Sequence, residues 1–278
     1  MKYFGELKKS DLGNNVTYLH ERMQSINWER RALDSEIEYS RALKSRPIEY
    51  PKFIRMFNAF VPWCGDFNRA VGVKLSDFQS FEEAEYQVKS IHKEKNLGRP
   101  NRYDIYSPAL NEALWYKYLL QKGYRLETII FFCSPTLKES LPSEFVFYVP
   151  SEKEYIEWFC CLVQSRGYYE EEWFQTVRPL QLNFAQVFKP YWLLMEGDLV
   201  GWVYCANLGE YACLFEVEIS QEFRGQGLGK ILLRAIRIEG GKMGARFILL
   251  QTGERLRSFY EKTGFRECSR NSIIWLRE

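Results

Sequence analysis

The chain has 278 residues, enough for one large domain or two of ordinary size. Its 38 Lys and Arg against 36 Asp and Glu give a net charge of +2, and 46% of the residues are hydrophobic. This composition predicts a folded globular protein without the basic excess that binding to a nucleic-acid backbone requires. Since no apolar run approaches the roughly 20 residues of a membrane span, and the first residues lack the apolar core of a secretory signal, we expect a cytoplasmic protein with no membrane partner.

Strands and helices alternate along most of the chain. The elements predicted for the first half are helical structure within 15–45, a strand at 68–75, a helix at 81–96, a strand at 102–108, a helix at 111–122 and a strand at 125–133. Segment 134–144 has two prolines and no apolar periodicity, so we place a domain boundary near Pro142, between domains 1–142 and 143–278.

The second half continues the same alternation. Its predicted elements are a strand at 145–149, helices at 152–164 and 171–188, strands at 191–195, 199–207 and 212–219, a helix at 229–239, a strand at 246–252, a helix at 254–263 and a strand at 266–276. Such an order indicates an α/β fold in which helices are layered on a mixed sheet.

The two halves end in similar sequences. ALWYKYLLQKGYRLE in the first and RLRSFYEKTGFRECS in the second both consist of an aromatic-bearing helix, a glycine and a strand, and Gly123 corresponds to Gly264. A glycine after a helix is an ordinary helix end, but the preceding helix and strand also correspond, which favours a duplication.

Histidine and cysteine restrict the possible chemistry. The chain has only two histidines, His20 and His92, so a nucleophile–histidine pair or a histidine-rich zinc site is not expected in the second half. The seven cysteines show no C-x-x-C spacing and mostly adjoin apolar residues, as buried reduced thiols do. We therefore expect no metal, and chemistry that depends on carboxylates, tyrosines, backbone amides or a bound cofactor.

A glycine-rich turn joins the strand at 212–219 to the following helix. Its sequence, Arg-Gly-Gln-Gly-Leu-Gly-Lys at 224–230, does not fit the P-loop, because Arg224 and Ile231 stand at required positions. The dinucleotide-binding fingerprint fails as well, because Lys230 replaces its last glycine. R-x-x-G-x-G does fit, and a glycine turn before a helix N-terminus favours an anion site over a merely flexible connection.

With this turn and the downstream SFYEKTGF sequence, residues 145–278 resemble the GNAT N-acetyltransferase superfamily. The first half resembles, more weakly, the degenerate N-terminal repeat of tandem bacterial members. It has SDFQS where the glycine turn would lie, which implies that it has lost cofactor binding. Residues 1–56 have no counterpart in this resemblance.

The resemblance implies an acyl-CoA donor, most simply acetyl-CoA. The predicted pyrophosphate site consists of the amides of Gly225, Gln226, Gly227, Leu228, Gly229 and Lys230, with the charges of Arg224 and Lys230 near it. The pantetheine arm is expected along main-chain groups of Val217 and Ile219, where two strands diverge, with Gln251 on the neighbouring strand within reach.

Acyl transfer to an amine requires a base, because a free alkylamine titrates near pH 10. Strand alternation predicts Leu214, Glu216 and Glu218 on one face, opposite Phe215, Val217 and Ile219. We take Glu216 as the preferred base and Glu218 as the second candidate, although both could simply face solvent.

The leaving thiolate requires an acid. Tyr260 matches the family's usual tyrosine for this role, and a tyrosine that is only packed would follow the same spacing.

Acceptor specificity in this fold usually comes from the loop between the first two helices, here 166–174. Tyr168, Tyr169, Glu172 and Trp173 could hold a cationic amine through ring faces and charge. The alternative is a solvated acidic helix start.

The predicted function is N-acylation of a small-molecule amine, a peptide N-terminus or a lysine. A second hypothesis is a CoA- or metabolite-binding module without turnover, with a regulatory role. A third, aminoacyl or peptidyl transfer from tRNA, is disfavoured by the slight basic excess of the first half. The abundant Trp and Tyr could line an acceptor groove or a homodimer face.

Overall fold

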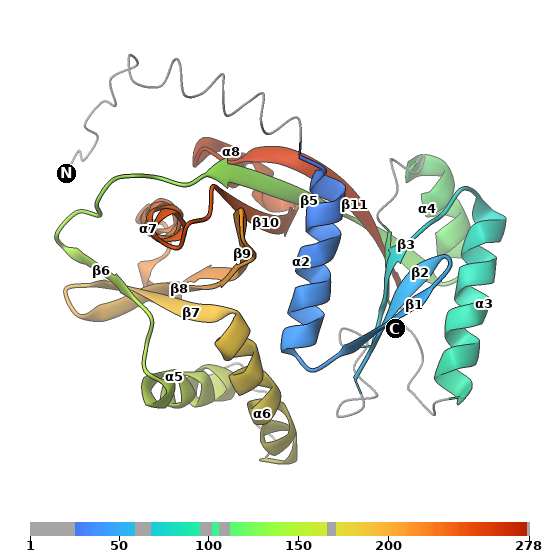
Figure 1. The fold of residues 1–278 in the computed structure, drawn as a ribbon, viewed down its shortest axis with the longest axis horizontal. Coiled ribbons are helices and arrows are strands. Elements are labelled where there is room, and N and C mark those ends of the chain that lie inside the picture. The colour runs from blue at the N-terminus through green and yellow to red at the C-terminus, as the bar shows by residue number, and fades with distance from the viewer. Residues whose placement is uncertain (1–25, 59–67, 95–101, 106–111, 166–170, 277–278) are drawn as a thin grey trace.

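The computed structural model describes residues 26–58, 68–94, 102–105, 112–165 and 171–276, and Figure 1 shows their arrangement. The strands form a single mixed sheet in the order β1-β2-β3-β4-β11-β5-β10-β9-β8-β7-β6. Within it, the pairs β3–β4 and β9–β10 are parallel and the other neighbouring pairs are antiparallel. The predicted fold, a mixed sheet flanked by helices, is confirmed, and most of its strand pairs are antiparallel.

The strands are β1 (Arg46–Tyr50), β2 (Phe53–Phe57), β3 (Ala70–Val73), β4 (Arg102–Ile105), β5 (Tyr124–Pro135), β6 (Phe145–Tyr148), β7 (Lys189–Met195), β8 (Asp198–Asn207), β9 (Tyr211–Ile219), β10 (Phe247–Gly253) and β11 (Arg266–Leu276). The helices are α2 (Trp28–Ala42), α3 (Phe78–Glu94), α4 (Glu112–Gln121), α5 (Glu152–Ser165), α6 (Glu171–Val187), α7 (Leu228–Lys242) and α8 (Arg257–Lys262), with short 3₁₀ turns η1 (Gln221–Phe223) and η2 (Glu254–Leu256). Among these described helices, none is both long and apolar enough to cross a membrane.

The hairpin of β1 and β2 was not expected from the sequence. Pro47 lies within β1 and Pro51 in the turn after it, and prolines argue against a strand. The hairpin forms because β1 is an edge strand, where a missing backbone N–H can be tolerated.

Helices cover both faces of the sheet. Alternate residues of β5 show this division, since Ile130 and Phe132 belong to the core under α7 and α8, whereas Phe131 and Cys133 belong to the core that includes α2 and α6 residues. In the first half, α3 and α4 cover a third core. Figure 1 shows α2 lying between the α7 side and the α3–α4 side of the molecule.

The two halves have the same order of elements, which supports the predicted duplication. The series β3-α3-β4-α4-β5 corresponds to β9-α7-β10-α8-β11, and in each series the first two strands are parallel neighbours. Gly123 and Gly264, the glycines matched by sequence, both have left-handed backbones, with φ of 81° and 88°. This conformation ends a helix and favours glycine.

The last strands of the two series are exchanged. β5 of the first half lies between β10 and β11, and β11 of the second half lies between β4 and β5. The segment between β5 and β6 contains the predicted boundary near Pro142, yet the sheet continues across both halves. The boundary therefore marks a connection along the chain and not a break in the sheet.

Candidate functional site

The parallel strands β9 and β10 separate part of the way along their length. Their pairing ends at Leu214 opposite Leu250. Beyond this point β9 pairs only with β8, and residues 251–253 of β10 pair only with β5. Beyond this point the facing backbone edges of β9 and β10 are not paired with each other, and we call this separation the opening between β9 and β10.

Glu216 lies at a β-bulge on the border of this opening. Its φ of 49° is in the left-handed region, and the register between β8 and β9 shifts at this point. After the bulge, Val217 and Ile219 pack against the same core as Leu214, under α7. The predicted alternation, which placed Val217 and Ile219 opposite Leu214, is therefore wrong, because an extra residue in a strand reverses which face the following side chains occupy.

The glycine turn presents free backbone amides before α7. Gly225 and Gly227 have φ of 81° and 82°, and Gly227 is the N-cap of α7 without a side-chain cap. Within the described part of the chain, the amides of residues 225–229 donate to no acceptor, whereas the Lys230 amide donates to the Gly227 carbonyl at 3.0 Å. Of the six amides predicted to bind pyrophosphate, five are thus available and that of Lys230 is already used.

The Arg224 side chain is engaged with the end of β9. Its Nε donates to the Ile219 carbonyl at 3.0 Å, and its Nη2 donates to Glu218 Oε1 at 3.1 Å. The guanidinium therefore holds the strand end and the Glu218 carboxylate, in addition to any charge that it offers to an anion.

Gly229 has a packing role that the motif does not reveal. A Cβ at this position would lie 3.0 Å from Phe259 Cζ. The absence of a side chain lets the first turn of α7 approach α8, which carries Phe259 and Tyr260. In the sequence, the glycine turn and SFYEKTGF occur together as two motifs, but nothing there indicates that Gly229 and Phe259 pack against each other.

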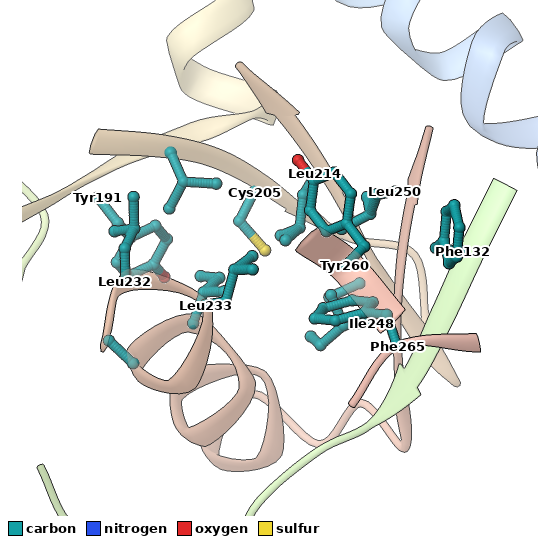
Figure 2. Packing of buried hydrophobic residues seen from close by; sticks show 14 of the residues in the cluster. Phe132, Tyr191, Cys205, Leu214, Leu232, Leu233, Ile248, Leu250, Tyr260 and Phe265 are labelled. Atoms are coloured by element: carbon teal, nitrogen blue, oxygen red, sulfur yellow. The ribbon is translucent and has the colours of Figure 1, made fainter. Parts of the chain in front are cut away.

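Tyr260 lies in the core between α7, α8 and the sheet. Figure 2 shows its ring beside Leu214 of β9 and Leu250 of β10, where the pairing of these strands ends. Its hydroxyl makes no hydrogen bond with the described residues. Burial raises the pKa of Tyr260 to about 12, so the phenol stays protonated at neutral pH.

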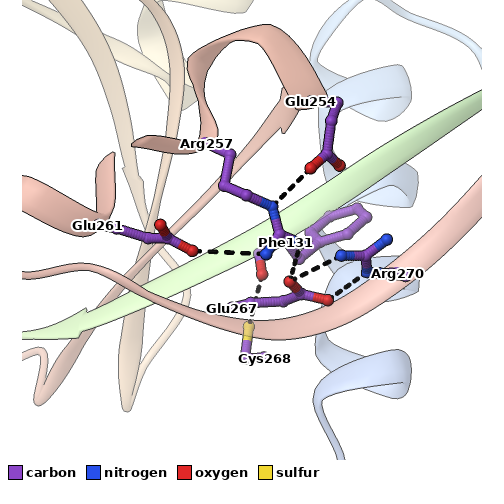
Figure 3. Close-up of polar contacts among 7 residues, drawn as sticks. All are labelled: Phe131, Glu254, Arg257, Glu261, Glu267, Cys268 and Arg270. Carbon is purple, nitrogen blue, oxygen red and sulfur yellow. Dashed lines mark hydrogen bonds and ion pairs between the residues drawn. The ribbon is translucent and has the colours of Figure 1, made fainter. Parts of the chain in front are cut away.

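An ion-pair cluster holds α8 in place (Figure 3). The Arg257 guanidinium forms ion pairs with Glu254 at 2.7 Å, with Glu261 at 3.4 Å and with Glu267 of β11. Glu267 also pairs with Arg270. Because the cluster joins η2, α8 and β11, it fixes the helix that carries Tyr260.

Three polar side chains lie on the opposite face, near Glu216. The hydroxyls of Tyr155 and Tyr204 are 3.0 Å apart, and Gln181 Nε2 donates to Tyr155 at 3.0 Å. Burial raises the pKa of Tyr155 to about 12 and raises the pKa of Tyr204 well above its ordinary value, and the negative charge of Glu216 acts in the same direction on both. These residues were not predicted from the sequence, because their spacing on helices and strands is that of core residues.

A cavity of about 850 Å³ opens between α5 and the ends of β8 and β9, and we call it the α5 cavity. It is lined by Trp158 and Leu162 of α5, Leu199 and Trp202 of β8, Asp198, Glu218, and residues 220–224, among others. Glu218, one of the two predicted bases, therefore faces this cavity.

The remaining predicted residues are only partly placed. Gln251 lines a small space with Phe131 and Asn271, on the face opposite to Tyr260. Tyr168 and Tyr169 lie outside the described residues. Glu172 and Trp173 are in the first turn of α6, but their side chains lie outside the described part of the structure.

Comparisons with known proteins agree with this geometry. Residues 151–265 match the sequence profile of the acetyltransferase (GNAT) family. A GCN5-related N-acetyltransferase from Kribbella flavida is similar in structure, with 15% identity and a TM-score of 0.59 over 86% of this chain and 92% of that one. A conserved protein of unknown function from Staphylococcus epidermidis has 12% identity and a TM-score of 0.63 over 85% and 96%. No curated protein matches the chain.

Proposed function

We propose that the protein is an N-acyltransferase with acetyl-CoA as donor and an amine as acceptor, because residues 151–265 match the GNAT acetyltransferase family. The observation that carries this proposal is the set of five unbonded amides at residues 225–229, at the start of α7. Such amides, with the helix dipole behind them, suit a pyrophosphate. The left-handed glycines leave open space where side chains would stand, since a Cβ at Gly225 or Gly227 would contact nothing within 4 Å.

The opening between β9 and β10 suits the donor's thioester arm. On the β10 side, Val217 and Ile219 have no partner strand, so main-chain groups there can bind an extended chain as a neighbouring strand would, although the Ile219 carbonyl already accepts from Arg224 Nε. When bound, the donor supplies a thioester carbonyl that an amine can attack.

The acid and the base come from opposite faces of the sheet. Tyr260 lies in the core on the α7 side, whereas Glu216 lies close enough to Tyr155 and Tyr204, on the α5–α6 side, to influence their pKa values. An amine entering from the α5–α6 side would lose its proton to Glu216, which we prefer over Glu218 because Glu216 lies at the bulge where β9 and β10 separate. Tyr260, still protonated at neutral pH, would donate a proton to the departing thiolate from the other side.

Calorimetric titration with CoA and acetyl-CoA tests the donor site. The unsubstituted protein should bind both, and Gly227→Glu should weaken binding at least tenfold, because a carboxylate then repels the pyrophosphate. Gly244→Glu is the matched control, since Gly244 has a φ of 86° and equally open surroundings in the turn after α7. It should leave CoA affinity unchanged.

Two results would count against the proposal. Absence of heat with the unsubstituted protein would remove the donor site altogether. Tight CoA binding without acylation of any amine would favour a non-catalytic CoA-binding module instead.

A further inference from the structure

We propose that the acceptor is a polycationic amine, held by its second positive charge in the α5 cavity while the first amino group reaches the opening between β9 and β10. This inference rests on the proposed function and names the substrate class of the same site. It depends on three properties of the cavity: its charge, its aromatic walls and its position next to the opening.

The described residues that line the cavity carry more negative than positive charge. They include the carboxylates of Asp198, Glu218 and Glu222, and one cation, Arg224. Because Arg224 is bonded to Glu218, it compensates only that carboxylate. Asp198 and Glu222 both line the cavity, are exposed and remain available to a cationic ligand.

One wall of the cavity lining contains two indole rings. The indole rings of Trp158 and Trp202 pack edge to face, with centroids 5.0 Å apart, and Trp202 is 5% exposed. Leu162 and Leu199 add apolar surface. Indole faces attract cations, and the aliphatic parts of an amine can cover the leucines, so this wall suits a charged group on an apolar or ring-shaped body.

The cavity adjoins the reaction centre. Glu218 lines it and belongs to the part of β9 that has separated from β10, two residues beyond Glu216. A volume of about 850 Å³ exceeds what a small monoamine fills and lies within the range of pockets that hold drug-sized ligands. A molecule with two or more amino groups would therefore occupy the cavity while one amine lies at the opening.

Two kinds of molecule share this chemistry, a linear aliphatic triamine and a sugar with several amino groups. Both are offered as acceptors, beside a monoamine of similar length, and turnover is followed by release of CoA. We expect kcat/KM for one of the polycations to exceed that of the monoamine at least tenfold, and its KM to rise with ionic strength. The sugar is favoured if the indole wall binds rings, and the triamine if charge spacing alone decides.

Asp198→Asn and Glu222→Gln test the charges without touching the proposed base or acid. Each should raise the KM of the polycation about two- to fivefold, as loss of a partly exposed ion pair does, with kcat and CoA affinity unchanged. Glu210→Gln is the matched control, because Glu210 is an exposed carboxylate paired with Arg246, outside the cavity lining. It should change none of these values.

The possible results distinguish a failure of the polycation proposal from a failure of the proposed acyltransferase function. Equal kcat/KM for the monoamine and the polycations, or unchanged KM in both carboxylate variants, would overturn the polycation proposal while acylation itself stands. A triamine could also bind by calorimetry, with lower affinity for the Asp198→Asn variant, and yet never be acylated. This result would support the charge preference and contradict the acyltransferase function.

Discussion

Tyr260 combines a buried ring with a hydroxyl that has no hydrogen-bond partner among the described residues. Its ring packs against Phe132 at 5.8 Å and Phe259 at 5.2 Å between centroids, so its position does not depend on the hydroxyl. The hydroxyl is thus not needed to hold the ring in place, and it remains available for the proton transfer that we propose.

Replacing Tyr260 with Phe should separate these two roles. The ring packing is preserved, so the free energy of unfolding should change by less than about 1 kcal/mol, and CoA affinity should stay the same. The rate of acyl transfer should fall on the order of 100-fold, because general acid catalysis supplies at least that factor. Urea unfolding, calorimetry and CoA release measure the three quantities. An unchanged rate would show that Tyr260 is only a packed side chain.

The elements themselves could be predicted from the sequence, because their signals are local. Apolar periodicity, the tight turn at 196–198 and the glycines that end helices place α3 to α8 and β3 to β11 within a few residues of their observed bounds. The bulge at Glu216 was not predictable, because it depends on the register between β8 and β9, and it reversed the faces of Val217 and Ile219. The exchange of β5 and β11 is likewise a property of distant pairing and leaves no local signal.

Helix α2 is held to the rest of the first half by a buried charge cluster and contacts the second half through an aromatic stack. Arg69, just before β3, forms ion pairs with Glu36 of α2 and with Asp104 of β4, the latter at 3.4 Å. On α2, Tyr39 stacks on Phe215 with ring centroids 4.5 Å apart. Since Phe215 directly precedes Glu216, the first half of the chain supports the bulge that borders the candidate site.

Arg69→Met should therefore destabilise the protein strongly. Arg69, Glu36 and Asp104 are each at most 2% exposed, and removing the cation leaves Glu36 buried without its charge partner. We expect a loss of about 3–5 kcal/mol in the free energy of unfolding, measured with urea. Arg30→Met is the control: Arg30 pairs with Asp34 at 2.9 Å, but its side chain is 63% exposed, so the loss should stay below about 1 kcal/mol. Equal losses would contradict the assigned role of the cluster.

At the scale of the whole molecule, we expect the protein to unfold in alkali because several of its tyrosines are buried. Burial raises the pKa values of Tyr155, Tyr191 and Tyr260 from 10.0 to about 12. A pKa that is higher in the folded than in the unfolded state stabilises the fold. This stabilisation is complete below pH 10 and is lost as the pH rises from 10 towards 12. Each phenol accounts for up to about 2–3 kcal/mol.

We expect the free energy of unfolding to be flat with respect to these groups up to pH 10 and to fall steeply above it. Circular dichroism and tyrosinate absorbance should change together. Tyr191→Phe tests a single group, because the Tyr191 hydroxyl contacts only the Met243 sulfur at 3.5 Å within the described structure. This variant should unfold at a higher pH than the unsubstituted protein, and an unchanged midpoint would refute the assignment.

The exchanged strands make the two halves one folding unit. β11 pairs with β4 and β5, both from the first half, and Ile130 and Phe132 of β5 are fully buried in the core under α7. A fragment of residues 143–278 would therefore expose the edge of β10 and leave β11 without any partner strand, so it should aggregate and fail to bind CoA. A fragment of residues 112–278 restores α4 and β5 and should recover part of the solubility and CoA binding. The full chain should unfold in urea in one transition, measured by circular dichroism and by tryptophan fluorescence, because neither half has a complete sheet by itself. Two separate transitions would show instead that the halves fold independently. A soluble 143–278 fragment that binds CoA as tightly as the full chain would show the same.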